Sequence, residues 1–387
     1  MKNKIFSFEL KSNVLSGKLS IFKLQEYFKK NNIYKCLFIF DKNLVQKSKY
    51  IKKFLGIYKK NRNIRIVFFE GKKEPTYQMV DETYNNLKKI NKIDCVVACG
   101  GGSAIDFAKA LAVVIKNKKP SLNFKGFHKK EIRSIPIVAI PSTVSSGAEL
   151  AFNAPLIDEE TGMKFGINVK SNTPSLSVLD PMVVFNSSKK LVITSSLSAL
   201  FRCVDTMFNS HSTTISKLFS KLSFKLLYEN ILIYQKNKNN LEAISKLQWG
   251  AYFSIASLLN SSSGIQGSIA YYFASKGVPQ GLTHAIAGMK CLEMNFNKGF
   301  YDFAELYEEI SFKNKTKQLN SKQKSKLLIL SLKKLFKINQ INLKKFNLKK
   351  NVNEILDFFP KVYSKNYLNN PINVGKSDLI KLINSIA

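Results

Sequence analysis

The chain has 387 residues, 45% of them hydrophobic, which is enough for two domains with cores of their own. Its formal charge of +35 raises the question of nucleic-acid binding. Lysine and asparagine recur along the whole chain, however, and no groove-reading or base-stacking motif accompanies them, so we expect no nucleic-acid partner.

The cellular compartment is indicated by the apolar runs and the cysteines. The start, "MKNKIFSFELK", lacks the apolar stretch of a signal peptide, and runs such as "IPIVAI" are far shorter than a membrane span. The five cysteines are odd in number and form no CxxC, which favours reduced thiols over disulfides or a thiolate zinc site. We therefore expect a cytoplasmic protein without a membrane partner.

Strands and helices alternate in the first half of the chain. Short apolar runs predict buried parallel strands, and these cover residues 34–41, 64–71, 94–102 and 135–143. Helical spacing of apolar residues fills the intervals, over 43–60, 80–92 and 103–117. The alternation indicates an α/β domain with a parallel, doubly wound sheet.

The second half shows almost only helical periodicity. Clear examples cover residues 216–234, 241–259 and 324–337. The change follows "VLDPMVVFNSS", which predicts an α/β domain over 1–185 and an all-helical domain over 186–387.

The stretch "CGGGSAIDFAKA" carries the clearest chemical signal. A buried strand ends in Gly100, Gly101 and Gly102, which allow positive φ angles and a close approach of the backbone to an anion. Ser103 suits the N-cap of the next helix, and Asp106 suits the acid of a capping box. The free N–H groups of such a helix start form a phosphate cradle. The pattern is not GxGxxG, so a tight turn without a ligand remains the alternative.

"GGGSAIDFAK" (100–109) resembles the GGGSxxDxAK motif of the iron-containing alcohol dehydrogenase family. The resemblance continues through "IPSTVSSGAE", "DEETGMKFGI", "PSLSVLDP", "GVPQGLTHAI" and "NNPINVGKSDLIKLI", which together span most of the chain. The more distant dehydroquinate synthases and glycerol-1-phosphate dehydrogenases fit the central motifs less well. The resemblance implies a dehydroquinate synthase-like fold, with an α/β dinucleotide-binding domain followed by a helical domain, and a homodimer.

The resemblance also implies which residues bind NAD or NADP. The two glycines 101 and 102 would meet the pyrophosphate, and Ser142 and Thr143 would follow the phosphate and ribose path. Asn153 and Lys164 would lie near the nicotinamide ribose, although Lys164 also suits a solvated hairpin. Asp41, at the end of the first strand, would bind the adenosine ribose, and its alternative is a common turn residue.

The family's metal is held by one Asp and three His, and the first two ligands are spaced DxxxH on a helix. In "DTMFNSH" Asp205 is retained, whereas Asn209 stands at the histidine position. His211 is six residues after Asp205, about 240° around a helix, so it faces elsewhere.

The two other histidine positions are also substituted. The third corresponds to Gly267, with Gln266 as the neighbouring choice, and the fourth corresponds to Gln280. The chain has only three histidines in all, His128, His211 and His284. Amides bind transition metals poorly compared with imidazole, so we expect no metal. A site rebuilt from Asp205 and His284 is the alternative.

Without a metal, other groups must serve the substrate oxygen. His284 and Lys276 are the candidate catalytic residues; Tyr271 and Tyr272 are alternatives that better suit the core. We expect an NAD(P)-dependent oxidoreductase interconverting an alcohol and an aldehyde. The resemblance to phosphonoacetaldehyde reductase-like members suggests a small phosphono- or phospho-aldehyde, with Arg202 and Lys276 as cations for its anion. The alternatives are a nucleotide-binding sensor or partner subunit and, last, a lyase.

Overall fold

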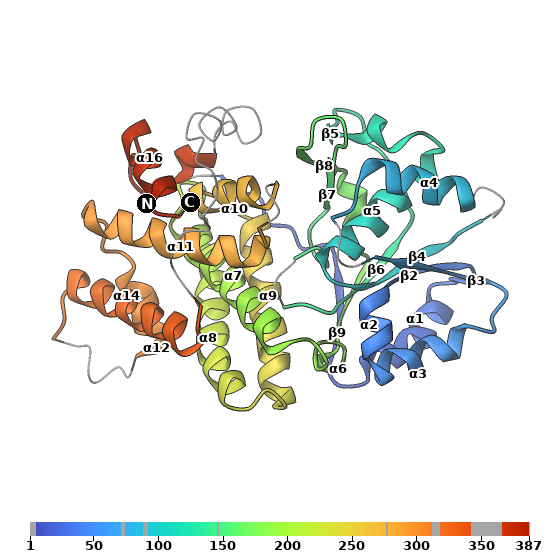
Figure 1. The fold of residues 1–387 in the computed structure, drawn as a ribbon, viewed down its shortest axis with the longest axis horizontal. Coiled ribbons are helices and arrows are strands. Elements are labelled where there is room, and N and C mark those ends of the chain that lie inside the picture. The colour runs from blue at the N-terminus through green and yellow to red at the C-terminus, as the bar shows by residue number, and fades with distance from the viewer. Residues whose placement is uncertain are drawn as a thin grey trace. The chain divides into compact units, whose positions relative to one another are not determined.

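The computed structural model describes residues 5–70, 74–87, 92–144, 147–275, 278–311, 318–341 and 366–386 (Figure 1). The chain forms two compact units. The α/β unit is Leu10–Val192, and the helical unit is Ile193–Ala387 together with the residues before Leu10. The boundary predicted from sequence, between residues 185 and 186, assigns that first segment to the α/β domain instead.

The α/β unit is built on a six-stranded sheet in the order β1-β9-β6-β4-β2-β3, and every neighbouring pair is parallel. The strands are β1 (Asn13–Ser16), β2 (Cys36–Asp41), β3 (Ile64–Phe69), β4 (Cys95–Gly100), β6 (Ile137–Pro141) and β9 (Leu176–Leu179). A smaller sheet in the order β5-β8-β7 consists of β5 (Gly126–Phe127), β7 (Asn153–Ile157) and β8 (Lys164–Asn168). The predicted parallel sheet is confirmed.

The sheet reverses its direction of growth between β2 and β4. From β2 the chain moves outward to β3, then returns to place β4 on the other side of β2. Ligands of open α/β sheets bind at such a switch point, beyond the carboxyl ends of the strands. β2 ends at Asp41 and β4 ends at Gly100, so these two residues flank the position where a ligand is expected.

Side chains of alternate residues pack on the two faces of the sheet, as the pleat requires. In β2, Leu37 and Ile39 belong to one buried cluster, whereas Phe38 and Phe40 belong to the other. Helices cover both faces (Figure 1): α1 (Leu24–Lys30), α2 (Lys42–Lys47), α3 (Lys49–Tyr58), α4 (Tyr77–Leu87), α5 (Gly102–Asn117) and α6 (Pro181–Val184), with the 3-10 turns η1 (Ser20–Lys23), η2 (Ser121–Phe124) and η3 (Lys170–Asn172). Because both faces are covered, the strands read as continuous apolar runs.

The predicted helix over residues 43–60 is two helices. Ser48 separates α2 from α3 in an extended conformation, and its Oγ accepts a hydrogen bond from the Ile51 N–H as the N-cap of α3. Such local side-chain bonds favour a new helix start over continuation. The single-helix prediction was therefore wrong.

The described residues of the helical unit form helices and one 3-10 turn. They are α7 (Lys189–Phe208), which begins in the α/β unit, α8 (Thr214–Lys236), α9 (Leu241–Leu259), α10 (Ile265–Ser275), α11 (Gln280–Asn297), α12 (Ala304–Ile310), α14 (Ser321–Ile338), η4 (Asn366–Asn369) and α16 (Lys376–Asn384). Thr213 caps α8 in a capping box and Asn240 caps α9, so both helices of this antiparallel pair begin at side-chain caps.

The segment before Leu10 is fixed to the helical unit. The Glu9 N–H donates to Asn260 Oδ1 at 2.9 Å, Asn260 Nδ2 donates back to the Glu9 carbonyl at 3.2 Å, and Phe8 stacks on Phe219 of α8. The chain thus contributes to the helical unit both before and after the α/β unit.

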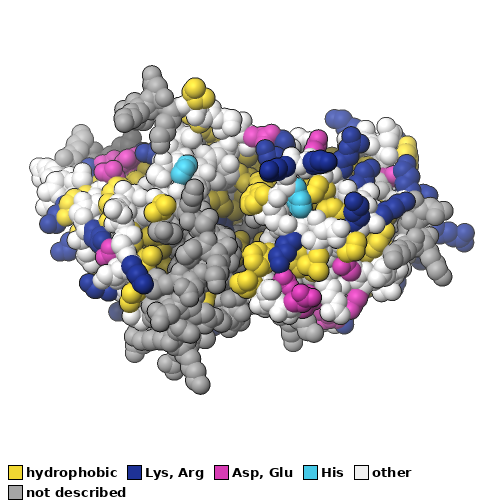
Figure 2. Space-filling view, turned by 90° about the horizontal axis from the view of Figure 1, so that it is seen from above, with side chains coloured by type: hydrophobic (Ala, Val, Ile, Leu, Met, Phe, Trp, Pro, Cys, Tyr) yellow, Lys and Arg dark blue, Asp and Glu magenta, His cyan; other side chains and the backbone are white. Residues whose placement is uncertain are grey.

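Helix α7 is the one described helix long and apolar enough to span a membrane, with a mean hydropathy of 1.4. Of that stretch, 83% is buried inside the structure, as in a core helix of a soluble protein. The absence of a membrane partner stays a prediction. On the face seen in Figure 2, lysine and arginine side chains are scattered over both units and do not form one stripe.

Candidate functional site

The end of β4 and the start of α5 touch the end of β2. A Cβ on Gly100 would lie 2.8 Å from the Ala104 Cβ and 2.9 Å from the Asp41 Cβ, so no larger residue fits without displacing one of them. A Cβ on Gly101 would meet nothing closer than 3.6 Å, at Thr143. The backbone of Gly101 is therefore accessible at the helix start, whereas Gly100 is required by packing.

Two details predicted for this loop were wrong. None of the three glycines 100–102 has a positive φ. The N-cap of α5 is Gly101, without a side-chain cap, and Ser103 lies inside the first turn. With no side-chain cap at Gly101, the N–H groups of this turn stay available to an anion.

The carboxyl ends of three neighbouring strands gather the predicted cofactor residues. Ser142 follows β6, and its N–H donates to the Gly100 carbonyl at 2.8 Å. Thr143 lies beside Gly101. Asp41 Oδ1 accepts hydrogen bonds from the N–H groups of Asn43 and Leu44, so this carboxylate caps α2.

Glu74 is a residue of this site that sequence reasoning missed. Its Oε2 accepts a hydrogen bond from Ser103 Oγ at 3.2 Å and forms an ion pair with Lys164 Nζ at 3.1 Å. Lys164 is 7% exposed, so it is not the solvated lysine of the alternative reading. The pair places one negative and one positive charge beside the first turn of α5. Glu74 precedes Ser103 by 29 residues, and no local pattern in the sequence links them.

Lys109, further along α5, is a second charged residue that was not predicted from the sequence. Lys109 is fully buried and donates to the carbonyls of Ala151 at 2.6 Å and Asn153 at 3.2 Å. Its Nζ lies 3.7 Å from Asp106 Oδ1. Burial lowers the pKa of Lys109 and raises that of Asp106, while each counteracts the shift of the other. Lys109 therefore joins α5 to β7, and a lysine among the alanines of a buried helix was the available signal.

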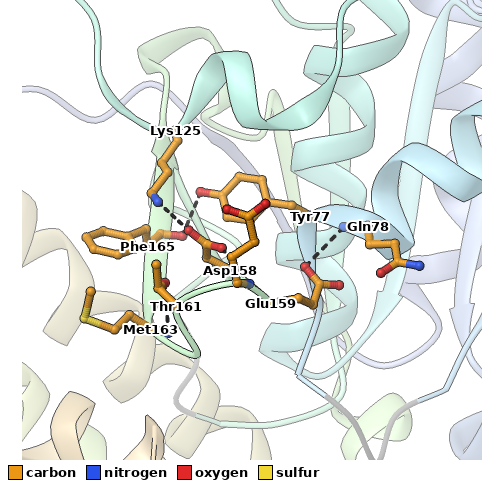
Figure 3. Close-up of polar contacts among 9 residues, drawn as sticks. Tyr77, Gln78, Lys125, Asp158, Glu159, Thr161, Met163 and Phe165 are labelled. Atoms are coloured by element: carbon orange, nitrogen blue, oxygen red, sulfur yellow. Dashed lines mark hydrogen bonds and ion pairs between the residues drawn. The ribbon is translucent and has the colours of Figure 1, made fainter.

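The hairpin of β7 and β8 is held by polar contacts at its tip (Figure 3). Lys125 Nζ pairs with Asp158 Oδ2 and lies 4.4 Å from the centre of the Phe165 ring. Tyr77 Oη donates to the Phe165 carbonyl at 3.2 Å. The Lys125 hydrogen bond lowers the pKa of Asp158. These contacts fix the strand that begins with Lys164.

The hairpin register separates the two residues predicted at the nicotinamide ribose. Asn153 pairs with Asn168 at one end, and Lys164 pairs with Ile157 at the other. Four residue steps along the strand separate these ends, about 13 Å. Asn153 and Lys164 therefore approach a ligand from different ends of the hairpin.

In the helical unit, one face of α7 carries the retained acid. Asp205 Oδ2 accepts a hydrogen bond from the Gly264 N–H at 2.7 Å, and the side chains of Gln266 and Ser263 also donate to the carboxylate. Burial raises the pKa of Asp205 to about 7, and these donors and the charge of Arg202 act against that rise. The carboxylate is held by neutral donors of the following loop and helix.

Asn209 follows the last residue of α7, and its amide is engaged at both ends. Nδ2 donates to the carbonyls of Asp205 and Ser262, and Oδ1 accepts a hydrogen bond from the His211 N–H. The helix ends at Phe208, so the helical spacing assumed for "DTMFNSH" stops before Asn209. His211 is exposed in the turn, as His128 is in its loop.

His284 is buried on α11 and points to α7. Its Nδ1 lies 3.0 Å from the Ser198 carbonyl, an acceptor, so Nδ1 carries the proton and Nε2 the lone pair. Burial, and then the charge of Arg202, lower the pKa of His284 to about 3. The ring is therefore neutral at physiological pH, and its outer nitrogen can accept a hydrogen bond but has no proton to donate.

Of the other predicted ligand positions, Gln266 donates to Asp205, whereas Gly267 has no side chain to reach it. A Cβ on Gly267 would lie 2.2 Å from Ser263 Oγ, so a side chain there would displace the serine. Gln280 is the first residue of α11, one turn before His284. Tyr272 is buried against Phe273, as expected of a core aromatic, whereas Tyr271 is partly exposed. Lys276 lies outside the described residues.

Comparison with known proteins agrees with the motifs. Residues 11–181 match the family model described as iron-containing alcohol dehydrogenase. The NAD-dependent methanol dehydrogenase of Bacillus methanolicus is 25% identical over 205 residues, which are 53% of this chain and 54% of that protein. Alcohol dehydrogenase 4 of Saccharomyces cerevisiae is 23% identical over 286 residues, 71% of this chain and 74% of that protein.

The fold agrees over nearly the whole length. The crystal structure of sulfoacetaldehyde reductase from Bifidobacterium kashiwanohense in complex with NAD+ superposes with a TM-score of 0.86 at 18% identity, covering 99% of both chains. The match over residues 11–181 agrees with the resemblance to the iron-containing alcohol dehydrogenase family, and the structural neighbours confirm the predicted fold class. The alcohol dehydrogenases among its relatives support its prediction as an enzyme.

The α/β unit fits the nicotinamide cofactor that the family resemblance implies. The accessible backbone of Gly101, the uncapped start of α5 and the carboxylate of Asp41 lie at the switch point of the sheet. A larger cavity of about 670 Å³ lies elsewhere in this unit, lined by Tyr27, Tyr84 and Lys116 among others. It borders the residues before β2, β4, β6 and β9, the edge opposite to the glycine loop, so it is not this site.

The helical unit does not fit the family's metal. Asp205 is saturated by neutral donors, Asn209 by backbone groups, and Gly267 has no side chain to offer. The cavity beside Asp205, about 20 Å³ and lined partly by Gln266 and Asn295, has room for about one water. In the part of the chain that the structure describes, no three His, Cys, Asp or Glu side chains form a metal-binding group.

Proposed function

We propose that the chain is an NAD-dependent oxidoreductase that interconverts an alcohol and an aldehyde. The observation that carries this proposal is the close contact between Gly100 and Asp41 at the switch point, beside the accessible helix start. Relatives that are NAD-dependent or bind NAD+ support the choice of cofactor. The negative charge of Asp41 favours a free ribose 2′-hydroxyl over the 2′-phosphate of NADP.

The residues of the α/β unit bind and orient the cofactor in this proposal. When bound, NAD accepts or supplies the hydride. The N–H groups of Gly102 and Ser103 bind the pyrophosphate, and Asp41 accepts a hydrogen bond from the adenosine ribose. Lys164, held by Glu74, approaches the cofactor from the far end of the hairpin.

We propose that no transition metal takes part and that His284 serves the substrate oxygen. Its Nε2 lone pair can accept a hydrogen bond from the hydroxyl of the alcohol and so orient the substrate. Because the pKa of the ring is lowered to about 3, His284 is a weak base, so it positions the hydroxyl and does not store the proton in either direction of the reaction. The second catalytic residue predicted from sequence, Lys276, remains a proposal based on sequence.

The proposed substrate is a small aldehyde with a strongly anionic group. The phosphono- or phospho-aldehyde predicted from the resemblance and the sulfoacetaldehyde of one structural neighbour share this chemistry. Because one relative is a methanol dehydrogenase, short neutral aldehydes are the substrates against which the anionic aldehydes should be compared.

Steady-state assays test the function. NADH and NADPH oxidation is followed with acetaldehyde, sulfoacetaldehyde and phosphonoacetaldehyde, with and without a chelator. We expect turnover with NADH, highest for an anionic aldehyde and unchanged by the chelator. Calorimetry with NAD+ runs in parallel. Binding without any turnover would favour the nucleotide-binding sensor or partner subunit, and turnover lost on chelation would contradict the metal-free site.

We also propose a cytoplasmic homodimer, which rests on the sequence features and the family resemblance. Light scattering coupled to size exclusion tests the dimer. A mass near 44 kDa, the mass of one chain, would contradict it.

A further inference from the structure

The cavity of about 670 Å³ at the amino ends of the strands is unused by the proposed function. Its lining comes from the residues that precede β2, β4, β6 and β9, from the end of α5, and from α1 and α4. All of these residues belong to the α/β unit. Small-molecule sites in proteins have volumes of about 300–1,000 Å³, so the cavity has the size of a ligand site.

Much of the lining is apolar. Ile135 is buried before β6, and Ile115 of α5 packs against the same hydrophobic cluster. Tyr27 of α1 and Tyr84 of α4 add two aromatic rings. Tyr27 Oη donates to Ser175 Oγ at 3.3 Å, which fixes one of these rings at the cavity. Aliphatic side chains and aromatic rings together favour a ligand with a flat apolar body.

The charged side chains of the lining are three lysines and one acid, so the lining has an excess of positive charge. The acid, Asp94, is already engaged: it pairs with Lys92 Nζ at 3.3 Å and accepts hydrogen bonds from two backbone N–H groups before β2. The two other lysines are Lys116 and Lys118, and no acidic side chain of the described residues pairs with either. Two unpaired ammonium groups therefore border an apolar cavity.

The position of these lysines at the end of α5 offers a second explanation, because cations stabilise the C-terminus of a helix. Lys116 lies in the last turn and Lys118 is the C-cap. Lys118, however, has a φ of 54°, a left-handed conformation that glycine adopts at lower cost. Lys119 is just as close to the helix end but does not line the cavity. Stabilising the helix end accounts for a positive charge, but not for a lysine at a position that favours glycine.

We propose that this cavity binds a small organic anion with a flat apolar body, such as an aromatic carboxylate or sulfonate. The ring of the ligand lies against the apolar side chains, and its acidic group pairs with Lys116 and Lys118. β4 runs from Cys95, beside the cavity, to Gly100 at the glycine loop, about 17 Å along the strand. The two sites are therefore separate, and a chain that bound no NAD+ could still bind this anion.

Calorimetry on the full chain tests the proposal with 2-naphthoate and with 2-naphthamide, a neutral probe of nearly the same shape. We expect 2-naphthoate to bind, and 2-naphthamide to bind about tenfold more weakly, because only the carboxylate pairs with the ammonium groups. Replacing both lysines, Lys116→Met with Lys118→Met, should weaken 2-naphthoate by about the same factor. Lys119→Met is the matched control and should keep the affinity of the wild type. Saturating NAD+ should leave 2-naphthoate binding unchanged.

Two further variants separate the site from the stability of the helix end. Lys118→Gly suits the left-handed backbone, so its melting temperature should stay close to that of the wild type while its affinity for 2-naphthoate falls. Ser134→Trp narrows the cavity without changing its charge and should weaken the binding of 2-naphthoate. No binding of 2-naphthoate at millimolar concentration, equal binding of the two probes, an equal loss in Lys119→Met and the double variant, or displacement by NAD+ would each overturn the proposal.

Discussion

The two units use their polar groups differently. In the α/β unit, the chain after β4 presents the backbone N–H groups of Gly102 and Ser103 at a helix start that no side chain caps. In the helical unit, polar side chains are hydrogen-bonded to backbone groups of the protein itself. Asp205 accepts a hydrogen bond from the Gly264 N–H, and the amides of Asn209 and Gln266 donate to backbone carbonyls. A phosphate site made of backbone N–H groups depends on the path of the main chain, so it is retained when side chains are substituted. A metal site depends on the identity of its ligand side chains, so three substitutions are enough to remove it.

The largest effect on stability is expected at Lys109, the buried charged residue of α5. Lys109→Met leaves Asp106 and two backbone carbonyls without their partner, which should cost about 3–5 kcal/mol of unfolding free energy. Lys116→Met, on the same helix but exposed, should change stability by less than about 0.5 kcal/mol. Urea unfolding followed by circular dichroism measures both. Equal effects would show that the buried ammonium is not holding α5 to the hairpin.

Two neighbouring glycines sharpen the contrast between packing and accessibility. Gly100→Ala forces a methyl against Asp41 and Ala104, and should cost about 2 kcal/mol. Gly101→Ala has room for its methyl, so its melting temperature should stay that of the wild type. Its affinity for NAD+ should nevertheless fall, by roughly tenfold, if the pyrophosphate lies against this backbone. Calorimetry measures the NAD+ affinity of both variants. An unchanged affinity in Gly101→Ala would mean that the pyrophosphate does not bind at this loop.

The sequence predicted the central strands well because strands buried on both faces read as continuous apolar runs. It did not predict β1, an edge strand whose residues are half-buried and mixed in polarity. At the sites, Glu74 escaped prediction because it meets Lys164 from 90 residues away. The helical reading of "DTMFNSH" failed after Phe208 because the Asn209 amide bonds to Asp205 and Ser262, which the local pattern does not encode.

His284 should make the helical unit less stable in acid. Folded His284 has a pKa lowered to about 3, whereas its unfolded pKa is about 6.5. Below pH 6.5 the unfolded chain therefore binds a proton at this residue that the folded chain does not, so the contribution of His284 to stability falls until pH 3. Between pH 7 and pH 5 this contribution should fall by about 1–2 kcal/mol, whereas the raised pKa of Asp205 acts in the opposite direction. His284→Asn should lose that much less over the same interval, measured by urea unfolding at both pH values. An identical pH dependence would mean that the ring is charged when folded.

The smallest effect concerns the charge beside the cradle. Glu74→Gln removes a negative charge next to Ser103 and should raise NAD+ affinity about two- to threefold at low salt. At 0.5 M salt the gain should vanish, since exposed charges are screened. Glu160→Gln, on the exposed hairpin tip, serves as the control. A loss of affinity in Glu74→Gln would instead assign the carboxylate to holding Lys164 for the cofactor.

The bonds between Glu9 and Asn260 join residues 251 positions apart. During synthesis, the residues of the α/β unit emerge first and can fold while Phe8 still lacks Phe219, because domains generally form in order from the N-terminus. Contacts of such long range are entropically late. We therefore expect the segment before Leu10 to pack on the helical unit late in folding. An N-terminal fusion or a truncation to residue 10 should then change the stability of the helical unit, although most of its sequence lies at the other end of the chain.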